Sequence, residues 1–277
     1  RRQRQMCIRD REIINELAAA KHKVASIALR INPEVDAHTH AKITTGMKEN
    51  KFGINLSQLG GVLDKLKEMK HVKLIGIHSH IGSQITDMSS FRNLVIRFNE
   101  IQEELEAHGV TVENLNFGGG LGIDYYHPNH LSIPAFDNYF AAIHKLLQVR
   151  PGQQVHFEPG RSIVAQCGTL ISKVLYVKEG ETKKFAILDA GFTELIRPAM
   201  YDAYHRIENI SSDEAVETYD VVGPICESSD VFGKDVELNK AHRGDLIALR
   251  SAGAYGEVMA SQYNCRHLPK AYYSDTI

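Results

Sequence analysis

The 277-residue sequence has few cysteines, almost no net charge and no long apolar run. Its four cysteines, Cys7, Cys167, Cys226 and Cys265, are scattered and form no CxxC pair, which argues against disulfides and a thiolate zinc site. A reducing cytoplasm is therefore the expected compartment. A net charge of −2 gives no sign of nucleic acid or an anionic membrane as partner. No apolar run approaches the roughly 18 residues that a membrane-spanning helix needs.

The first eleven residues, RRQRQMCIRDR, differ from the rest of the chain. They are basic, show no helical periodicity and resemble translated sequencing-adapter sequence. A disordered basic tail is the alternative interpretation. In either case we expect residues 1–11 to lie outside the fold, which then begins at residue 12.

Strand and helix patterns alternate from residue 12 to residue 162. The strand patterns are VASIALRINP, HVKLIGIHSHIGSQ, VTVENLNFGGGLGI and QQVHFEPGRS. The longest helical pattern, SSFRNLVIRFNEIQEELEAHG, has a serine at its start and Gly109 at its end, as capping requires. The alternation predicts a parallel α/β sheet, either a barrel or doubly wound. From residue 163 to residue 277, β-rich runs separated by polar turns predict a second, mostly antiparallel β domain.

Glycines and polar residues follow the last three predicted strands of the first region, in HSHIGSQ, FGGGLG and EPGR. In a β/α barrel, residues just past successive strands surround one site. Gly118, Gly119 and Gly120 allow close approach of the backbone and offer N–H groups to an anion, and Ser83 and residues 160–161 add further donors. These segments predict a phosphate site. Glu158 stands beside it, where a carboxylate is costly unless a positive or hydrogen-bonding group meets it.

Each of these signals also has a simpler interpretation. GGG alone is more often a turn than a phosphate site, and GGGLGI is not a GxGxxG fingerprint because Ile123 replaces the last glycine. His78 and His80 share a strand face and could bind a metal, but no nearby cysteine or carboxylate completes such a site. Either histidine could instead be a satisfied core residue. Glu158 could form a structural ion pair.

Five motifs together are much more specific. HSHIGSQ, NFGGGLGI, EPGR, GPICESSD and GAYG, in this order, resemble the fold-type III pyridoxal-phosphate decarboxylases, and within them the diaminopimelate decarboxylase family. The resemblance runs from about residue 12 to the end of the chain. It implies a (β/α)8 barrel of the alanine-racemase type, of which only the C-terminal half is present, followed by an antiparallel β-barrel or sandwich domain.

The resemblance also implies the cofactor, pyridoxal 5'-phosphate, and its contacts. Glu158 would face the pyridine nitrogen and keep it protonated, so that the ring acts as an electron sink. His80 would stack on the ring. The implied cofactor-binding residues are Ser83, Gly118, Gly119, Gly120, Glu158, Pro159, Gly160, Arg161 and Tyr255.

The implied reaction is decarboxylation of meso-2,6-diaminopimelate to L-lysine and CO2. Cys226 matches the proton donor, although without its CESSD context a small buried hydrophobe would be the better interpretation. Glu227 matches a contact to the distal ammonium of the substrate. Planar guanidinium groups suit the distal carboxylate, and the matching binders are Arg161, Arg197 and Tyr201. Tyr255 is implied as a further substrate contact. By itself Arg197 would more often form a surface ion pair. The resemblance further implies a homodimer with shared active sites.

The chain departs from the family in three ways. A complete barrel has roughly 250 residues and eight strands, whereas four strand patterns precede the β domain here. The Schiff-base lysine of the family lies upstream of all matched segments, and Lys42, Lys48 and Lys51 do not match it. The sequence also stops at SDTI, where a closing strand would be expected. We therefore expect a fragment that is inactive alone.

Three other functions remain open at this point. The protein could be another fold-type III decarboxylase, acting on ornithine, arginine or carboxynorspermidine. It could bind pyridoxal phosphate without catalysis, although such carriers would lack the β domain and its CESSD segment. A phosphate-sugar barrel enzyme with Glu158 as base would leave GPICESSD and GAYG unexplained.

Overall fold

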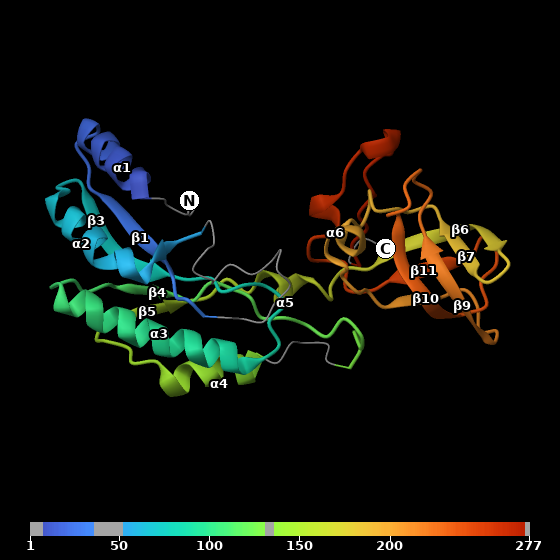
Figure 1. Ribbon diagram of the computed structural model, residues 1–277, viewed down its shortest axis with the longest axis horizontal. Coiled ribbons are helices and arrows are strands. Elements are labelled where there is room, and N and C mark those ends of the chain that lie inside the picture. Colours follow the sequence, from blue (N-terminus) through green and yellow to red (C-terminus); the bar gives the residue numbers. More distant parts are fainter. Residues whose placement is uncertain (1–7, 36–51, 131–135, 275–277) are drawn as a thin grey trace. The chain divides into compact units, whose positions relative to one another are not determined.

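The computed structural model describes residues 8–35, 52–130 and 136–274 (Figure 1). The chain divides into two compact units. The first contains residues 1–122 and 135–160, and the second contains residues 123–134 and 161–277. Each unit is described by itself below. No helix in the described ranges is both long enough and apolar enough to cross a bilayer.

A parallel sheet forms the centre of the first unit. Its described strands are β1 (Ala25–Asn32), β2 (Ile54–Asn55), β3 (Val72–His78), β4 (Asn114–Asn116) and β5 (Gln154–His156). They lie in the order β2-β1-β3-β4-β5, and every neighbouring pair is parallel. The last four residues of β1 are all buried, as expected of a strand covered on both faces. The four predicted strands are present, and β2 is a short addition that the sequence pattern did not show.

The helices of the first unit follow the apolar periodicity of the sequence. They are α1 (Ile8–Ala20), η1 (Leu56–Gln58), α2 (Leu59–Glu68), α3 (Met88–Ala107) and α4 (Phe136–Leu146). In α3 the predicted serine cap is wrong: Asp87 is the N-cap, because its Oδ1 accepts from the Ser89 N–H at 2.8 Å. Gly109 follows the helix with φ +72°, a left-handed conformation that glycine adopts without strain.

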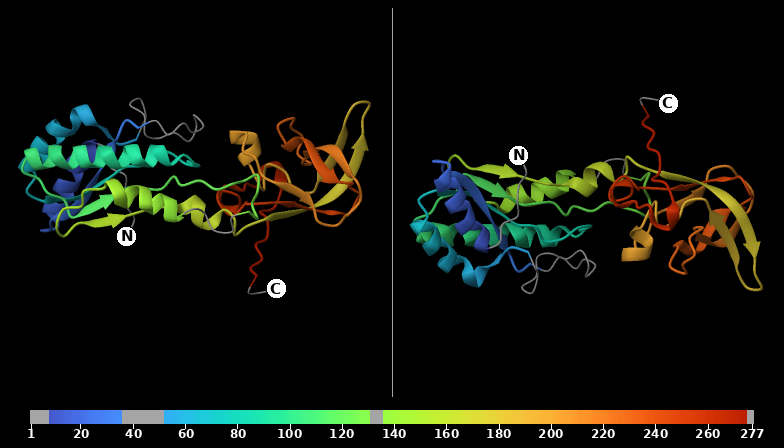
Figure 2. Two further views of the ribbon diagram at one scale, coloured as in Figure 1. Left: turned by 90° about the horizontal axis from the view of Figure 1, so that it is seen from below. Right: turned by 90° about the horizontal axis from the view of Figure 1, so that it is seen from above.

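Aromatic packing joins α3 and α4 to the sheet. The two helices lie side by side in Figures 1 and 2. Phe91 of α3 contacts Tyr139 of α4 edge to face, with the ring centroids 4.7 Å apart. Phe98 of α3 stacks on Phe117, with the ring centroids 4.1 Å apart. Phe117 directly follows β4, so the core holds the end of this strand, and therefore the loop after it, in place.

The helix α1 begins earlier than the sequence pattern predicted. Residues 8–11 were expected to belong to a tail outside the fold, but the helix starts at Ile8 and Arg11 is only 1% exposed. Arginine is a good helix former and an acidic residue such as Asp10 is favourable in a first turn, so the charged composition of this stretch does not prevent it from joining the helix. Residues 1–7 lie outside the described residues.

A mixed sheet forms the centre of the second unit. Its strands are β6 (Leu170–Glu179), β7 (Lys184–Leu188), β8 (Ile207–Asn209), β9 (Val216–Val222), β10 (Val231–Asn239) and β11 (Leu246–Leu249). The order is β10-β9-β7-β6-β11-β8, and β6 and β7 form the long yellow hairpin of Figure 2. Most pairs are antiparallel as predicted, but β7 and β9 are parallel, because the chain passes through α6 and β8 before β9 returns beside β7.

The short helices of the second unit are α6 (Arg197–Tyr201), η2 (Glu257–Met259) and η3 (Tyr263–Cys265), and α5 (Gly160–Val164) begins at the change from one unit to the other. The stretch 123–134 groups with this unit, whereas the expected boundary near residue 162 placed it in the first. Its contacts explain the grouping. Gln166 Nε2 donates to the Pro128 carbonyl at 3.0 Å, and Arg250 Nη2 donates to Asn129 Oδ1 at 2.8 Å.

Candidate functional site

The three glycines after β4 bring neighbouring strand ends together. A Cβ on Gly118 would overlap the Ser79 carbonyl oxygen, and one on Gly119 would overlap the Glu158 carbonyl oxygen. At Gly120 the added atom would lie 2.8 Å from the Gly82 carbonyl oxygen. Only glycine allows this approach, so HSHIGSQ, FGGGLG and EPGR meet in one place, as the sequence predicted. The glycines thus serve the packing of backbone on backbone.

Two of the three glycine amides are used within the protein. The Gly118 N–H donates to Asn116 Oδ1 at 2.8 Å, and the Gly119 N–H donates to His80 Nδ1 at 3.2 Å. The Gly120 N–H donates to no acceptor in the described part of the chain. Of the predicted glycine donors, this geometry leaves Gly120 to bind an anion.

The ring of His80 is fixed and uncharged. Because a backbone N–H only donates, Nδ1 of His80 accepts and a proton on the neutral ring resides on Nε2. Burial is the main cause that lowers the pKa of His80 to about 4, with help from the charge of Arg30. A neutral, oriented imidazole suits the predicted stacking on an aromatic ring.

The Glu158 carboxylate is oriented by its neighbours and remains open to a ligand. Its side chain is 42% exposed, Asn116 Nδ2 donates to Oε1 at 2.9 Å, and His78 Nε2 lies 3.7 Å from Oε2. Arg30, in β1, is buried, and burial lowers its pKa while the charge of Glu158 opposes that shift. The positive group that a strand-end carboxylate requires is therefore present.

His78 is buried but not satisfied. Its Nε2 atom has no hydrogen-bond partner among the described residues, which excludes the simple interpretation as a satisfied core histidine. Burial lowers the pKa of His78, and the nearby Glu158 raises it. An orphaned polar atom beside a carboxylate with an open face indicates a place prepared for a polar ligand.

The second unit buries two guanidinium groups around one tyrosine. Arg161 and Arg197 are 7% and 5% exposed. Arg161 Nη1 donates to the Tyr125 hydroxyl at 2.7 Å, and Arg197 lies 4.9 Å over the Tyr125 ring. Arg161 also lies 5.0 Å from the ring centroid of Tyr255. The structure thus brings together two of the predicted distal-carboxylate binders, and Tyr201 ends the short helix α6 that Arg197 begins.

Arg197 has no carboxylate within ion-pairing distance among the described residues. The interpretation as a surface ion pair is therefore wrong, because the side chain is buried and lacks an acidic partner. Burial lowers the pKa of Arg197, and the charge of Arg161 lowers it further. A buried, uncompensated cation is costly, and an anionic ligand would remove that cost.

Cys226 and Glu227 lie in an exposed loop, which the buried Asp230 stabilises through hydrogen bonds. Asp230 is 3% exposed and accepts from the N–H groups of Phe192 and Ile225, each at 2.7 Å. Cys226 itself is exposed, so it is not the buried hydrophobe of the simpler interpretation. Glu227 Oε1 accepts from the Tyr263 hydroxyl at 2.6 Å.

Comparison with known proteins agrees with these features. The family described as "Pyridoxal-dependent decarboxylase, pyridoxal binding domain" matches residues 2–165. The diaminopimelate decarboxylase of Bacteroides thetaiotaomicron is 65% identical over 96% of this chain and 69% of its own length. The chain belongs to the diaminopimelate decarboxylase family.

A solved member of this family, diaminopimelate decarboxylase from Helicobacter pylori complexed with L-lysine, superposes with a TM-score of 0.86 at 39% identity, over 94% of this chain and 64% of that one. The Zymomonas mobilis enzyme is 43% identical over 93% of this chain and 61% of its own length. The chain thus spans about two thirds of the family members that it matches. The fold is that of the fold-type III pyridoxal-phosphate decarboxylases, and pyridoxal 5'-phosphate is the family's cofactor.

Several residues of this chain contact the candidate site residues but were not recognised from the sequence: Arg30, Asn116, Tyr125, His205, Asp230 and Tyr263. Asn116 and Asp230 lie at the ends of two of the motifs, NFGGGLGI and GPICESSD, and the other four lie outside all five motifs. Each has at least one partner distant in sequence. Lys42, Lys48 and Lys51 lie outside the described residues. Among described residues no group of three or more His, Cys, Asp or Glu side chains is arranged to hold a metal ion.

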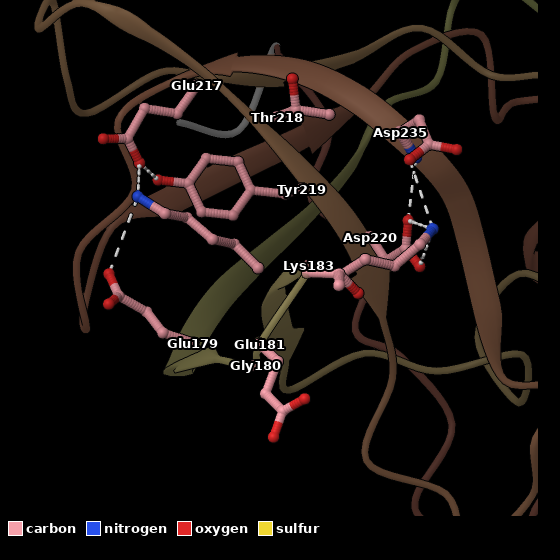
Figure 3. A pocket seen from close by; sticks show the side chains of 11 residues that line it. Glu179, Gly180, Glu181, Lys183, Glu217, Thr218, Tyr219, Asp220 and Asp235 are labelled. Carbon is pink, nitrogen blue, oxygen red and sulfur yellow. Dashed lines mark hydrogen bonds and ion pairs between the residues drawn. The ribbon is translucent and has the colours of Figure 1, made fainter.

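A pocket of about 510 Å³ in the second unit is lined by two lysines and five carboxylates (Figure 3). Lys183 Nζ lies 3.0 Å from Asp220 Oδ2 and 3.3 Å from Asp235 Oδ1. Lys184 lies 2.8 Å from Glu217, which also accepts from the Tyr219 hydroxyl. Both lysines are thus already paired, and the remaining charge of the pocket is acidic, with none of the predicted site residues in its lining.

Proposed function

We propose that the complete protein, rather than this chain alone, decarboxylates meso-2,6-diaminopimelate to L-lysine and CO2 with pyridoxal 5'-phosphate as cofactor; the holoenzyme in the experiments below is the complete protein loaded with that cofactor. The observation that carries this proposal is the pair of buried guanidinium groups, Arg161 and Arg197, with no acidic partner beside Arg197 in the described residues. Diaminopimelate has a carboxylate at the end that does not react, and two planar cations suit it. The enzyme named for this substrate is 65% identical to the chain.

The residues of the first unit fit the cofactor. The exposed carboxylate of Glu158 offers an acceptor to the cofactor, and the unpaired Gly120 N–H offers a donor to its phosphate. Beside the carboxylate, Nε2 of His78 is a further polar atom without a hydrogen-bond partner among the described residues. Glu158 would hold a proton on the pyridine nitrogen, and His80 would pack against the ring. We retain the other predicted contacts as part of the proposal: Ser83, Gly118, Gly119, Pro159, Gly160, Arg161 and Tyr255.

When bound, the cofactor supplies an electron sink for the carbon that loses CO2. The residues of this chain would bind the substrate and protonate the carbon that has lost CO2. Arg161, Arg197 and Tyr201 would bind the distal carboxylate, and Glu227, oriented by Tyr263, would accept from the distal ammonium. Exposed Cys226 would deliver a proton from its Sγ to the carbon that has lost the carboxylate.

Three parts of the proposal concern the complete protein. The parallel sheet would belong to a (β/α)8 barrel and the mixed sheet to a β-barrel or sandwich. The protein would form a homodimer with shared active sites, and it would act in the cytoplasm. Light scattering of the purified holoenzyme tests the dimer, and a monomer at micromolar concentration would contradict it.

Substrate preference tests the function. The holoenzyme is incubated separately with meso-diaminopimelate, L-ornithine, L-arginine and carboxynorspermidine, and the amine products are separated by chromatography. We expect L-lysine and CO2 from diaminopimelate and little product from the others, because those substrates lack the distal carboxylate. Polyamine formation at a comparable rate would favour the alternative decarboxylases, and cofactor binding without any product would favour a non-catalytic carrier.

A further inference from the structure

His205, in the loop after α6, joins Arg197 to the backbone. It is 1% exposed, and its Nε2 atom lies 2.7 Å from Arg197 Nη1. On the other side of the ring, Nδ1 lies 2.8 Å from the carbonyl oxygen of Arg250. The family resemblance gave this histidine no role.

The two partners fix the tautomer of His205. A carbonyl oxygen only accepts, so Nδ1 carries the proton and donates to Arg250. A guanidinium only donates, so Nε2 is unprotonated and accepts from Arg197. Burial, together with the charges of Arg197 and Arg161, lowers the pKa of His205 to about 4. The ring is neutral at physiological pH.

Tyr125 fixes Arg197 from a second direction. Its ring lies 4.9 Å from the guanidinium and meets His205 edge to face at 5.2 Å. Both neighbours that orient Arg197 are therefore uncharged. A carboxylate at position 205 would make an equally good hydrogen bond, but it would neutralise the guanidinium and compete with the carboxylate of a ligand.

We propose that His205 is a positioning residue for substrate recognition: it orients Arg197 with a neutral acceptor and so leaves the positive charge available to the distal carboxylate. This inference rests on the proposed function. It assigns the selection of a carboxylate-bearing ligand to three residues, Tyr125, Arg197 and His205, of which only Arg197 carries charge.

Two ligands that differ only by the carboxylate test the proposal. L-Lysine retains the distal carboxylate of diaminopimelate, and cadaverine is lysine without it. Their inhibition constants are measured in the holoenzyme for wild type, His205→Gln, His205→Leu and His205→Glu, with melting temperatures to verify folding. His242→Gln is the matched control, because that histidine is 47% exposed and pairs with surface acids of the same unit.

We expect His205→Leu and His205→Glu to weaken L-lysine inhibition about tenfold or more and to raise the KM for diaminopimelate, with little change for cadaverine. His205→Gln, which retains an uncharged acceptor, and His242→Gln should stay within about threefold of wild type. Unchanged L-lysine inhibition in the Glu variant, or a parallel loss for both ligands, would overturn the inference. If the wild type neither binds L-lysine nor turns over diaminopimelate, the proposed function itself fails.

Discussion

The two units place charge in opposite ways. In the first, the acidic Glu158 is 42% exposed, and its basic neighbours Arg30 and His78 are buried behind it. In the second, the cations Arg161 and Arg197 are buried themselves, and the groups beside Arg197 are neutral. Under the proposed function, the first unit would offer its anion to a protonated ring nitrogen, and the second would offer its cation to a carboxylate. In each unit, the ligand that we propose carries the charge opposite to that of the exposed or unneutralised group.

The largest expected effect concerns the buried neutral histidine of the second unit. In the unfolded chain histidine takes up a proton near pH 6.5, whereas folded His205 does so only near pH 4. Acidification from pH 6.5 to pH 4 therefore favours the unfolded state, by up to about 3 kcal/mol. Urea unfolding of wild type and His205→Gln across this range should show a steeper loss of stability in wild type. Identical slopes would show that His205 is not neutral.

The next effect concerns the carboxylate of the first unit. Glu158→Gln should lower kcat about 10- to 100-fold, since a hydrogen bond to a charged group contributes about 1.5–3 kcal/mol. Glu113→Gln is the matched control, because Glu113 forms an exposed ion pair with Lys73 near β4 and should change activity little. Steady-state assays of the holoenzyme decide the matter, and equal activity of both variants would remove Glu158 from the mechanism.

A third prediction separates backbone packing from ligand contact. Gly119→Ala should lower the free energy of unfolding of the first unit by about 1–3 kcal/mol, because its Cβ would overlap the backbone of Glu158. Gly160→Ala should be nearly neutral, because no atom lies within 4 Å of an added Cβ there. Chemical denaturation measures both. Equal stability of the two variants would mean that the three strand ends do not pack as described.

The smallest effect concerns the exposed rim of the second unit. Tyr263→Phe removes the hydrogen bond to Glu227 and should raise the KM for diaminopimelate about two- to tenfold, corresponding to about 0.5–1.5 kcal/mol. Tyr272→Phe, at a tyrosine 74% exposed, is the comparison variant and should leave KM unchanged. A larger loss in kcat than in KM would indicate that Tyr263 acts on the reacting end instead.

The sequence predicted the parts of the site that directly follow the strands of the parallel sheet. HSHIGSQ, FGGGLG and EPGR each follow a strand, so the pattern of parallel strands was enough to bring Gly119 and Glu158 together. Arg30 and His205 were not predictable in the same way. Arg30 looks like one polar residue in an apolar strand, and its role depends on Glu158, far away in sequence.

The fold shows the same limit. Alternation predicted the strands of the first unit, because side-chain periodicity is a local property. The parallel pairing of β7 with β9 depends on where a longer connection returns, which periodicity does not record. The cap of α3 was misassigned to serine because Asp87 and the serines after it are all good caps, and only the backbone geometry distinguishes them.

The stretch 123–134 leaves one unit to complete the other, and the chain therefore changes unit three times. Ile123 and Tyr125 form a small core with Ala165 and Ala254, so a truncated β unit that begins at residue 161 would lack two members of its own interior. It would also lose the aromatic ring beneath Arg197. Dissection of this protein into separately expressed halves should therefore follow the spatial grouping, with residues 123–134 supplied to the β unit through an engineered connection.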